Sequence, residues 1–249
     1  SSAASDVYKR QVLCITWLVP EVDSPERLGV DRGQNRLAVA ATPQGRAIFF
    51  HGGEVAHRRR LFQKRRAQLQ KARKFRALKR LERKEARWMR AVNHTISRRI
   101  VRFAKALNAD VWMEDLSGIR ESKQSRKARS DAGKSRHTWA FYDLEQKIRY
   151  KLELAGRTLH KRPAAYTSKS DHRNGVIGKR HKHLFVGYDG YRCDADWNAA
   201  VNLAQWDGFS CPLSLKEAVS VMDTVGLGDG LLGSALNSMN TVRLQAERG

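Results

Sequence analysis

Short apolar runs separated by turn residues open the interpretable part of the chain. Leu28–Val30 and Leu37–Ala41 are two such runs, and Gly33, Gln34 and Asn35 lie between them. A third run, Ala47–Phe50, follows the turn signal Pro43-Gln44-Gly45. Three short apolar runs punctuated by turns predict an antiparallel meander of three strands.

A long helical segment follows the meander. Residues 54–107 contain neither proline nor glycine. In the first part the apolar residues form only a thin stripe: Leu61, Phe62, Leu69, Phe75, Leu78, Leu81 and Trp88. The second part, Val92–Leu107, has the fuller three-and-four spacing of a helix packed on a core. We expect a helical hairpin whose first arm is exposed.

The rest of the chain predicts two more strands and two more helices. Residues 109–119 predict a buried strand, residues 139–155 a helix, residues 157–161 one more strand, and residues 196–206 a last helix. Residues 118–137 are polar and basic, which predicts a loop. Residues 166–192 show little periodicity.

We interpret the two ends of the chain as lying outside the predicted domain. Residues 6–11, DVYKRQ, are encoded by GATGTGTATAAGAGACAG, a string that resembles a transposase-adapter end used in sequencing libraries. We interpret residues 1 to about 11 as an assembly artefact joined to a truncated reading frame. Residues 12–27 are interpreted as a short strand and turn left from an upstream domain, and residues 207–249 as a poorly structured tail.

Composition narrows the function classes. The 249 residues are 41% apolar, enough for one domain of ordinary size with attachments. The 48 Lys and Arg against 25 Asp and Glu give a net charge of +23, which indicates a polyanionic partner and above all nucleic acid. A merely solvated basic surface is the alternative. An anionic membrane is disfavoured because the basic segments lack an apolar face. No apolar run is long enough to span a bilayer.

Three scattered cysteines predict no disulfide framework and are consistent with a reducing cytoplasm.

The positive charge is concentrated in the predicted hairpin. From Arg58 to Arg90 nearly half of the positions are Lys or Arg, and Glu82 and Glu85 are the only acids. A surface coiled coil with ion pairs is the alternative, but backbone phosphates are the better counter-charge. The predicted nucleic-acid contacts are Arg58, Arg59, Arg60, Lys64, Arg65, Arg66, Lys71, Arg73 and Lys74.

Three acids stand in apolar or structured settings. Asp31 lies in the first strand, Glu114 follows the run Val-Trp-Met, and Asp196 begins the last helix. Each has a structural alternative: a turn-forming Asp, an acid where a strand leaves the core, and a helix-capping acid. Together they match the requirement of phosphodiester hydrolysis for carboxylates that hold two Mg²⁺ ions.

The motifs LGVDRG, VWMEDLSGIR and DADWNAAVNLA resemble the three RuvC motifs of the TnpB family of transposon-encoded RNA-guided nucleases. Fanzor proteins and type V CRISPR effectors are similar. The resemblance covers residues 28–204. It implies an α/β, RNase H-like (RuvC) mixed sheet over residues 28–165, with a basic helical insertion at 54–107, a ribbon at 166–192 and a final RuvC helix at 193–206.

The resemblance also implies roles and partners. Asp31, Glu114 and Asp196 would be the catalytic metal ligands for Mg²⁺, with Mn²⁺ as a substitute, while Asn198 and Asn202 would support the helix. The loop at 118–137 would be a lid. The partners would be a guide RNA and a DNA target, in the cytoplasm of a prokaryote and on its nucleoid. A non-cleaving RNA and DNA binder, or a compact type V CRISPR effector, are the alternatives.

One segment departs from the family pattern. Where the family folds a zinc ribbon from two Cys-x-x-Cys pairs, this sequence has Asp171, Asn174, Val186 and Asp189. Cys193 falls outside the pattern, and the spacing of His172, His181 and His183 around it fits zinc poorly. We therefore expect that zinc is absent and that the ribbon is degenerate.

Overall fold

The computed structural model describes residues 16, 18–33, 35–116, 132–163 and 166–205. The predicted artefact at 1–11, the tail from 207 onwards and most of the predicted lid lie outside these residues. Residues 132–137 were expected to be loop but belong to helix α4 (Ala132–Glu153). Their polar composition is compatible with either state, because helices on a protein surface carry one polar face.

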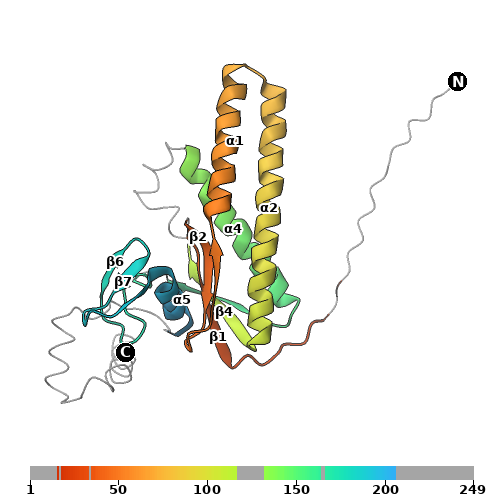
Figure 1. Ribbon diagram of the computed structural model, residues 1–249. Helices are drawn as coiled ribbons and strands as arrows, with labels where there is room; N and C mark the ends of the chain where they lie inside the picture. Colours follow the sequence, from red (N-terminus) through yellow and green to blue (C-terminus); the bar gives the residue numbers. More distant parts are fainter. Residues whose placement is uncertain (1–15, 17, 34, 117–131, 164–165, 206–249) are drawn as a thin grey trace, which may run out of the picture.

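A five-stranded mixed sheet forms the centre of the molecule (Figure 1). Its order is β3-β2-β1-β4-β5, and the strands are β1 (Glu26–Asp31), β2 (Arg36–Ala41), β3 (Ala47–His51), β4 (Ala109–Asp115) and β5 (Leu159–Pro163). The first three strands are antiparallel, as the meander pattern predicts, and β4 and β5 run parallel to β1.

The strand expected at the start of residues 12–27 lies largely outside the described residues, and residues 18–25 form no strand. Pro20 and Pro25 lack the N–H that a sheet ladder needs. Instead the segment is held by a hydrogen bond from the backbone N–H of Val22 to the carbonyl of Gly156 (2.9 Å).

Helices cover both faces of the sheet. Side chains alternate between the faces along each strand, so Leu28, Val30 and Met113 point to α4 and to α2 (Phe75–Ala106). On the opposite face, Val39 and Ala41 pack against α5 (Ala195–Gln205) in a smaller cluster.

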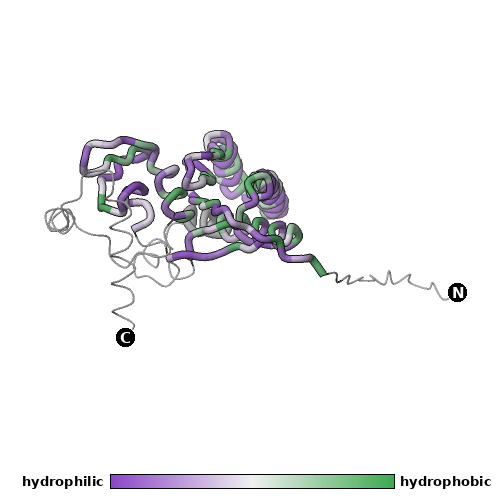
Figure 2. The backbone as a smooth tube through the Cα atoms, turned by 90° about the horizontal axis from the view of Figure 1, so that it is seen from below, coloured by the Kyte–Doolittle hydropathy of each residue, from purple (hydrophilic) through white to green (hydrophobic). Residues whose placement is uncertain are grey.

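The predicted hairpin is formed by α1 (Gly53–Lys71) and α2, which turn at residues 72–74 and project from one end of the sheet (Figure 1). Arg73 adopts φ 52° in this turn. Phe62 and Trp88 pack between the helices with ring centroids 5.8 Å apart. Coloured by hydropathy, the paired helices are largely purple with interspersed green positions, in agreement with a thin apolar stripe (Figure 2).

A second, three-stranded antiparallel sheet lies beside α5 (Figure 1). Its strands are β6 (Lys179–His181), β7 (Leu184–Val186) and β8 (Arg192–Asp194), in the order β6-β7-β8. We call residues 166–194 the ribbon unit. Among the described helices, none is both long and apolar enough to cross a membrane.

Candidate active site

Three acids meet where β1 and β4 end. Asp31 is the last residue of β1, and Glu114 lies beside it because the parallel register pairs Val30 with Met113. Asp196 comes from the first turn of α5, which packs on this face of the sheet. Asp31 and Asp196 are 8% and 6% exposed. We call Asp31, Glu114 and Asp196 the acid cluster.

Gly29 allows α5 to reach the acid cluster. A Cβ at this position would overlap the carbonyl oxygen of Ala200 in α5. The start of the helix is set by Asp194, whose Oδ1 accepts hydrogen bonds from the backbone N–H groups of Asp196 (3.1 Å) and Trp197 (3.0 Å). Asp194 is therefore the N-cap, and Asp196 is left to act in the cluster.

Basic side chains approach the acid cluster from the ribbon unit and from β2. Arg180 Nη2 in β6 is 2.6 Å from Asp196 Oδ1, and His183 Nδ1 is 3.6 Å from Asp196 Oδ2. Arg36 pairs with Asp194 and lies 3.9 Å from Asp196 Oδ2. Arg180 is thus the closest of these basic groups to the buried carboxylate of Asp196.

Two further contacts orient Glu114. Its Oε1 accepts a hydrogen bond from the Thr167 hydroxyl (2.9 Å). Its backbone carbonyl accepts one from Arg32 Nη2 (2.8 Å), and Arg32 is buried against Glu145 of α4 (3.0 Å). The strand end, α4 and the ribbon unit are therefore tied together at the acid cluster.

Burial and mutual repulsion raise the pKa values of acids in the cluster. Burial, with added repulsion from Glu114 and Asp196, raises the pKa of Asp31 to about 7. Burial also raises the pKa of Glu114, although the hydrogen bond from Thr167 and the charge of Arg32 oppose it.

The donor chemistry of the acid cluster suits a hard divalent cation, which binds carboxylate oxygens. As placed in the described residues, no three His, Cys, Asp or Glu side chains converge closely enough to hold a metal ion. Arg180 supplies part of the missing positive charge, so metal binding requires the side chain of Asp196 to exchange this partner.

The predicted degenerate zinc positions take other roles. Asp171 and Asp189 both accept hydrogen bonds from Arg173, and Asn174 Oδ1 accepts one from the backbone N–H of Val176 (3.0 Å). Val186 lies in β7. Burial, with repulsion from nearby acids, raises the pKa of the Cys193 thiol to about 11, so this cysteine stays protonated at neutral pH.

The predicted nucleic-acid contacts mostly face solvent. Arg58, Arg60, Lys64, Arg65, Lys71, Arg73 and Lys74 are exposed, and Arg59 is half-buried. Arg66 differs from the prediction: it is buried between the helices and pairs with Glu85 of α2. Its burial follows from helical spacing, because Arg66 falls on the same face as Phe62 and Leu69.

Sequence reasoning missed Arg180, Thr167, Arg32 and Asp194. Asp194 had a readable signal, since an Asp directly before an Ala-rich helix is a preferred N-cap. The other three reach the acid cluster through long-range contacts that leave no local pattern. Asn198 and Asn202 do have the supporting role expected of them, through hydrogen bonds to backbone of the ribbon unit.

Comparison with known families divides the chain into two matched parts. The family described as a probable transposase (OrfB_IS605) matches residues 8–119, which include Asp31 and Glu114. The family described as Cas12f1-like, TNB domain, matches residues 141–203, which include Asp196. The acid cluster is therefore assembled from both matched parts.

A curated relative is the CRISPR-associated endodeoxyribonuclease Cas12f1 of Sulfoacidibacillus thermotolerans. It is 29% identical over an alignment of 203 residues, and the match covers 74% of this chain and 46% of the relative. The chain thus spans about half the length of the curated relative that it matches.

Two solved structures share the fold. A cryo-EM structure of a Cas12f1–sgRNA–target DNA complex matches with a TM-score of 0.59 and 21% identity, over 75% of this chain and 51% of that chain. A cryo-EM structure of a CRISPR-Cas12f ternary complex matches with a TM-score of 0.63 and 19% identity, over 80% of this chain and 42% of that chain. The chain is thus similar to the OrfB_IS605 probable transposases over residues 8–119, to the Cas12f1-like TNB domain over residues 141–203, and to Cas12f1 itself.

Proposed function

We propose that this chain is the nuclease part of an RNA-guided DNA endonuclease of the TnpB and type V kind. The observation that carries the proposal is the meeting of Asp31, Glu114 and Asp196, from two parallel strands and a helix, at one edge of the sheet. The mixed sheet, with three antiparallel strands and two further parallel ones, supports the proposal that it is an RNase H-like (RuvC) sheet. The TnpB-type motifs and the Cas12f1 relative support the same assignment.

The acid cluster would hold Mg²⁺, in two positions, with Mn²⁺ as a substitute. When bound, these ions activate water and stabilise charge on the attacking and leaving oxygens of a phosphodiester. The residues of this chain supply the rest. Thr167 fixes the carboxylate of Glu114, Asp194 fixes the start of α5, and Gly29 sets how closely Asp196 approaches.

Arg180 has a part in the same proposal. Its guanidinium contacts Asp196 and lowers the pKa of both Asp31 and Glu114, against the effect of burial. A guanidinium beside the reacting bond can bind two phosphate oxygens. We infer that Arg180 turns to the phosphodiester when cations take its place at Asp196.

The basic arm, defined as residues 53–90, would hold nucleic acid. Its exposed cations far outnumber the acids of the arm, so backbone phosphates are the better counter-charge. Guide RNA and target DNA in the cytoplasm are the proposed partners.

A second candidate is a binder of RNA and DNA that does not cut. It is favoured by the ion pair of Arg180 with Asp196 and by the lack of three converging metal donors among the described residues. In that case Arg180 would serve as a permanent counter-charge. The chain would bind nucleic acid with a steep salt dependence and without a response to Mg²⁺.

Cleavage by the chain, purified with the RNA that accompanies it on expression from its native locus, separates the two. Labelled double-stranded and single-stranded DNA would be incubated in Mg²⁺, in Mn²⁺ and in chelator. We expect metal-dependent products that Asp31→Asn and Glu114→Gln remove. Asp110 lies in the same strand as Glu114 but outside the acid cluster, so Asp110→Asn is the matched control. Cleavage that survives Asp31→Asn would overturn the assignment, and metal-independent binding alone would favour the second candidate.

A further inference from the structure

The ribbon unit has little apolar material to hold it together. Its strands are three residues long, and its fully buried apolar side chains are those of Val176 and Phe185. Leu184 and Tyr188 are about two-fifths exposed. Small sheets of this kind are marginal without a staple, which in natural proteins is often a disulfide or a metal ion.

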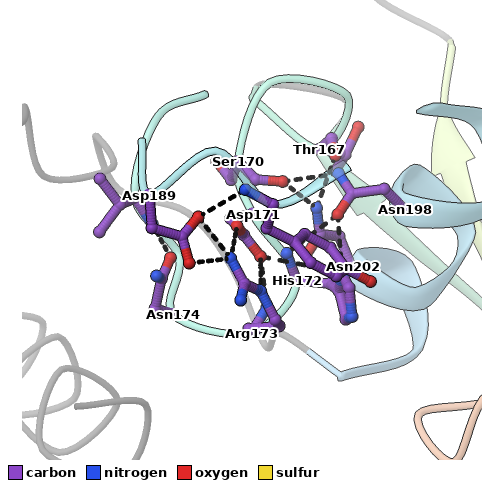
Figure 3. A network of polar contacts seen from close by, with 11 residues as sticks. Thr167, Ser170, Asp171, His172, Arg173, Asn174, Asp189, Asn198 and Asn202 are labelled. Carbon is purple, nitrogen blue, oxygen red and sulfur yellow. Dashed lines mark hydrogen bonds and ion pairs between the residues drawn. The ribbon is translucent and has the colours of Figure 1, made fainter. Parts of the chain in front are cut away.

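Arg173 bridges two parts of the ribbon unit that are distant in sequence (Figure 3). Its Nη2 donates to Asp171 Oδ2 (2.8 Å) and to both oxygens of Asp189 (2.9 and 2.8 Å), and its Nε donates to Asp171 Oδ1 (3.1 Å). The guanidinium also lies 3.8 Å from the ring centroid of Tyr191. One planar cation therefore joins the 171–175 turn to the 187–191 turn.

The guanidinium is the charged partner of both carboxylates. Asp171 is fully buried and also accepts a hydrogen bond from the backbone N–H of Arg173 (2.9 Å), which carries no charge. A buried carboxylate that loses its charged partner is strongly destabilising. Asp189 is brought to the same guanidinium nitrogen, so the two acids would repel each other in its absence. Gly187 makes room for the bridge, because a Cβ there would lie 2.6 Å from Asp171 Oδ2 and 2.9 Å from Asp189 Oδ1.

The turn that Arg173 holds also carries the contacts to α5. The His172 backbone N–H and Nδ1 lie 3.0 and 2.9 Å from Asn198 Oδ1. The Ser170 carbonyl accepts hydrogen bonds from the side-chain amides of Asn198 and Asn202, both at 2.7 Å. Figure 3 shows these amides pointing from α5 into the ribbon unit.

The same segment touches a second acid of the cluster. Thr167, whose carbonyl accepts from Asn202 (2.8 Å), donates its hydroxyl to Glu114. The position of α5, and with it Asp196, is therefore linked to the position of Glu114 through residues 167–172.

We propose that Arg173 is a positioning residue: its bridge between Asp171 and Asp189 takes the place of a metal cross-link in the ribbon unit and sets α5 against the acid cluster. The cross-link itself follows from contacts within the ribbon unit. Its effect on the acid cluster rests on the proposed function. Two of the four positions where the family resemblance places zinc thiolates are the carboxylates of this bridge.

Hydrogen–deuterium exchange and Mn²⁺ binding, measured by electron paramagnetic resonance on the whole chain, test the two parts separately. Arg173→Met should speed exchange about tenfold or more in residues 167–175, 187–191 and 195–202. Arg173→Lys keeps the positive charge but loses the planar guanidinium. Its exchange rate should therefore fall between those of Arg173→Met and wild type. Arg192→Met, at an exposed arginine of β8, is the control and should leave exchange unchanged.

Gly187→Ala keeps every charge yet crowds the bridge, so it should reproduce the faster exchange of Arg173→Met in these segments. Mn²⁺ affinity at the acid cluster should fall about tenfold in both variants, the usual cost of losing a residue that orients metal ligands. Wild-type exchange should not respond to 1,10-phenanthroline.

Equal exchange rates in Arg173→Met and Arg192→Met would overturn the assignment of Arg173 as the cross-link. An exchange rate in wild type that rises with the chelator would do the same. Faster exchange with unchanged Mn²⁺ affinity would overturn the positioning role. If wild type binds no Mn²⁺, the proposed function fails and takes the positioning role with it, while the exchange data still decide whether Arg173 is the cross-link.

Discussion

Arginine is used in opposite ways in the basic arm and in the ribbon unit. In the basic arm, Arg60, Arg65 and Arg73 face solvent in a helical hairpin that contains few acids. In the ribbon unit, Arg173 and Arg180 are also exposed, yet each contacts a carboxylate at under 3 Å. A cation on a surface with few acids stays available to a mobile polyanion, whereas a cation paired with a carboxylate contributes to the fold. Position and partners decide what an arginine does, and the charge total alone does not.

The largest expected effect separates the two regions by nucleic-acid affinity. Lys64→Gln, Lys71→Gln and Lys74→Gln together should weaken binding of a labelled single-stranded oligonucleotide by about a hundredfold near 0.1 M salt, because each lost phosphate contact lowers the salt slope by about 0.7 to 0.9. Fluorescence anisotropy at several salt concentrations measures both quantities.

A matched triple variant controls for net charge. Arg98→Gln, Arg102→Gln and Lys105→Gln remove the same charge from exposed positions near the sheet end of α2. An equal loss of affinity in both triple variants would mean that nucleic acid responds to total charge, and the distinction between the regions would be lost.

The second effect disrupts the acid cluster and spares the basic arm. Gly29→Ala forces a methyl group into the Ala200 carbonyl, and overpacking of this kind costs about 3 kcal/mol or more in the free energy of unfolding. Urea denaturation followed by tryptophan fluorescence gives the loss. Gly53→Ala, where a Cβ meets no atom within 4 Å, is the control and should not destabilise. Oligonucleotide binding by Gly29→Ala at low temperature should stay near wild type.

The third effect is a pH dependence that belongs to the acid cluster. The pKa of Asp31 is about 7 in the folded protein and near 4 when unfolded, so the folded protein holds a proton that the unfolded chain releases in between. The contribution of Asp31 to the free energy of unfolding is therefore greatest at low pH and declines as the pH rises through this window. Thermal melting of wild type and Asp31→Asn from about pH 5 to about pH 8 should show a decline in wild type that the variant lacks.

Added Mn²⁺ should reverse part of that decline, because cation binding favours the ionised carboxylate. Parallel melting curves for wild type and Asp31→Asn across the range would show that Asp31 titrates normally.

The smallest effect concerns Arg66, the predicted nucleic-acid contact that is buried between the two helices of the basic arm. Arg66→Met should lower stability by about 1 to 3 kcal/mol, because Glu85 loses a partly buried partner. Glu85→Gln should give a similar loss, and the double variant should cost less than the sum. A fall in oligonucleotide affinity as large as that of Lys64→Gln would instead return Arg66 to the binding surface.

Much of the large sheet and the hairpin could be predicted because their signals are local. The turn residues after Val30 and Ala41 separated the three strands, and the spacing of Ile96, Ile100 and Ala104 indicated the buried half of α2. The meeting of the three acids was expected from the family resemblance; composition alone left each acid with an equally good structural reading.

A degenerate ribbon at residues 166–192 was expected from the family resemblance, but its strands and cross-links could not be predicted, because they depend on contacts between residues far apart in sequence. Lys179–His181 is a strand with no apolar residue, and its partner Leu184–Val186 is only three residues long. Arg173 and Asp189 are sixteen residues apart, and no periodicity joins them. Arg180 likewise looks like one more cation in a basic segment until the fold brings it to Asp196.

Because α2 is one continuous helix, it fixes the distance between the tip of the basic arm and the main core. This single helix runs from Phe75 at the tip of the basic arm to Ala106 beside β4, about 48 Å at 1.5 Å per residue. Its inner half is locked into the main core through Ile96 and Ile100. A nucleic-acid strand gripped at the tip would thus be presented to the acid cluster at a set spacing, so shortening the arm by whole helical turns should move the point of cutting stepwise along the strand.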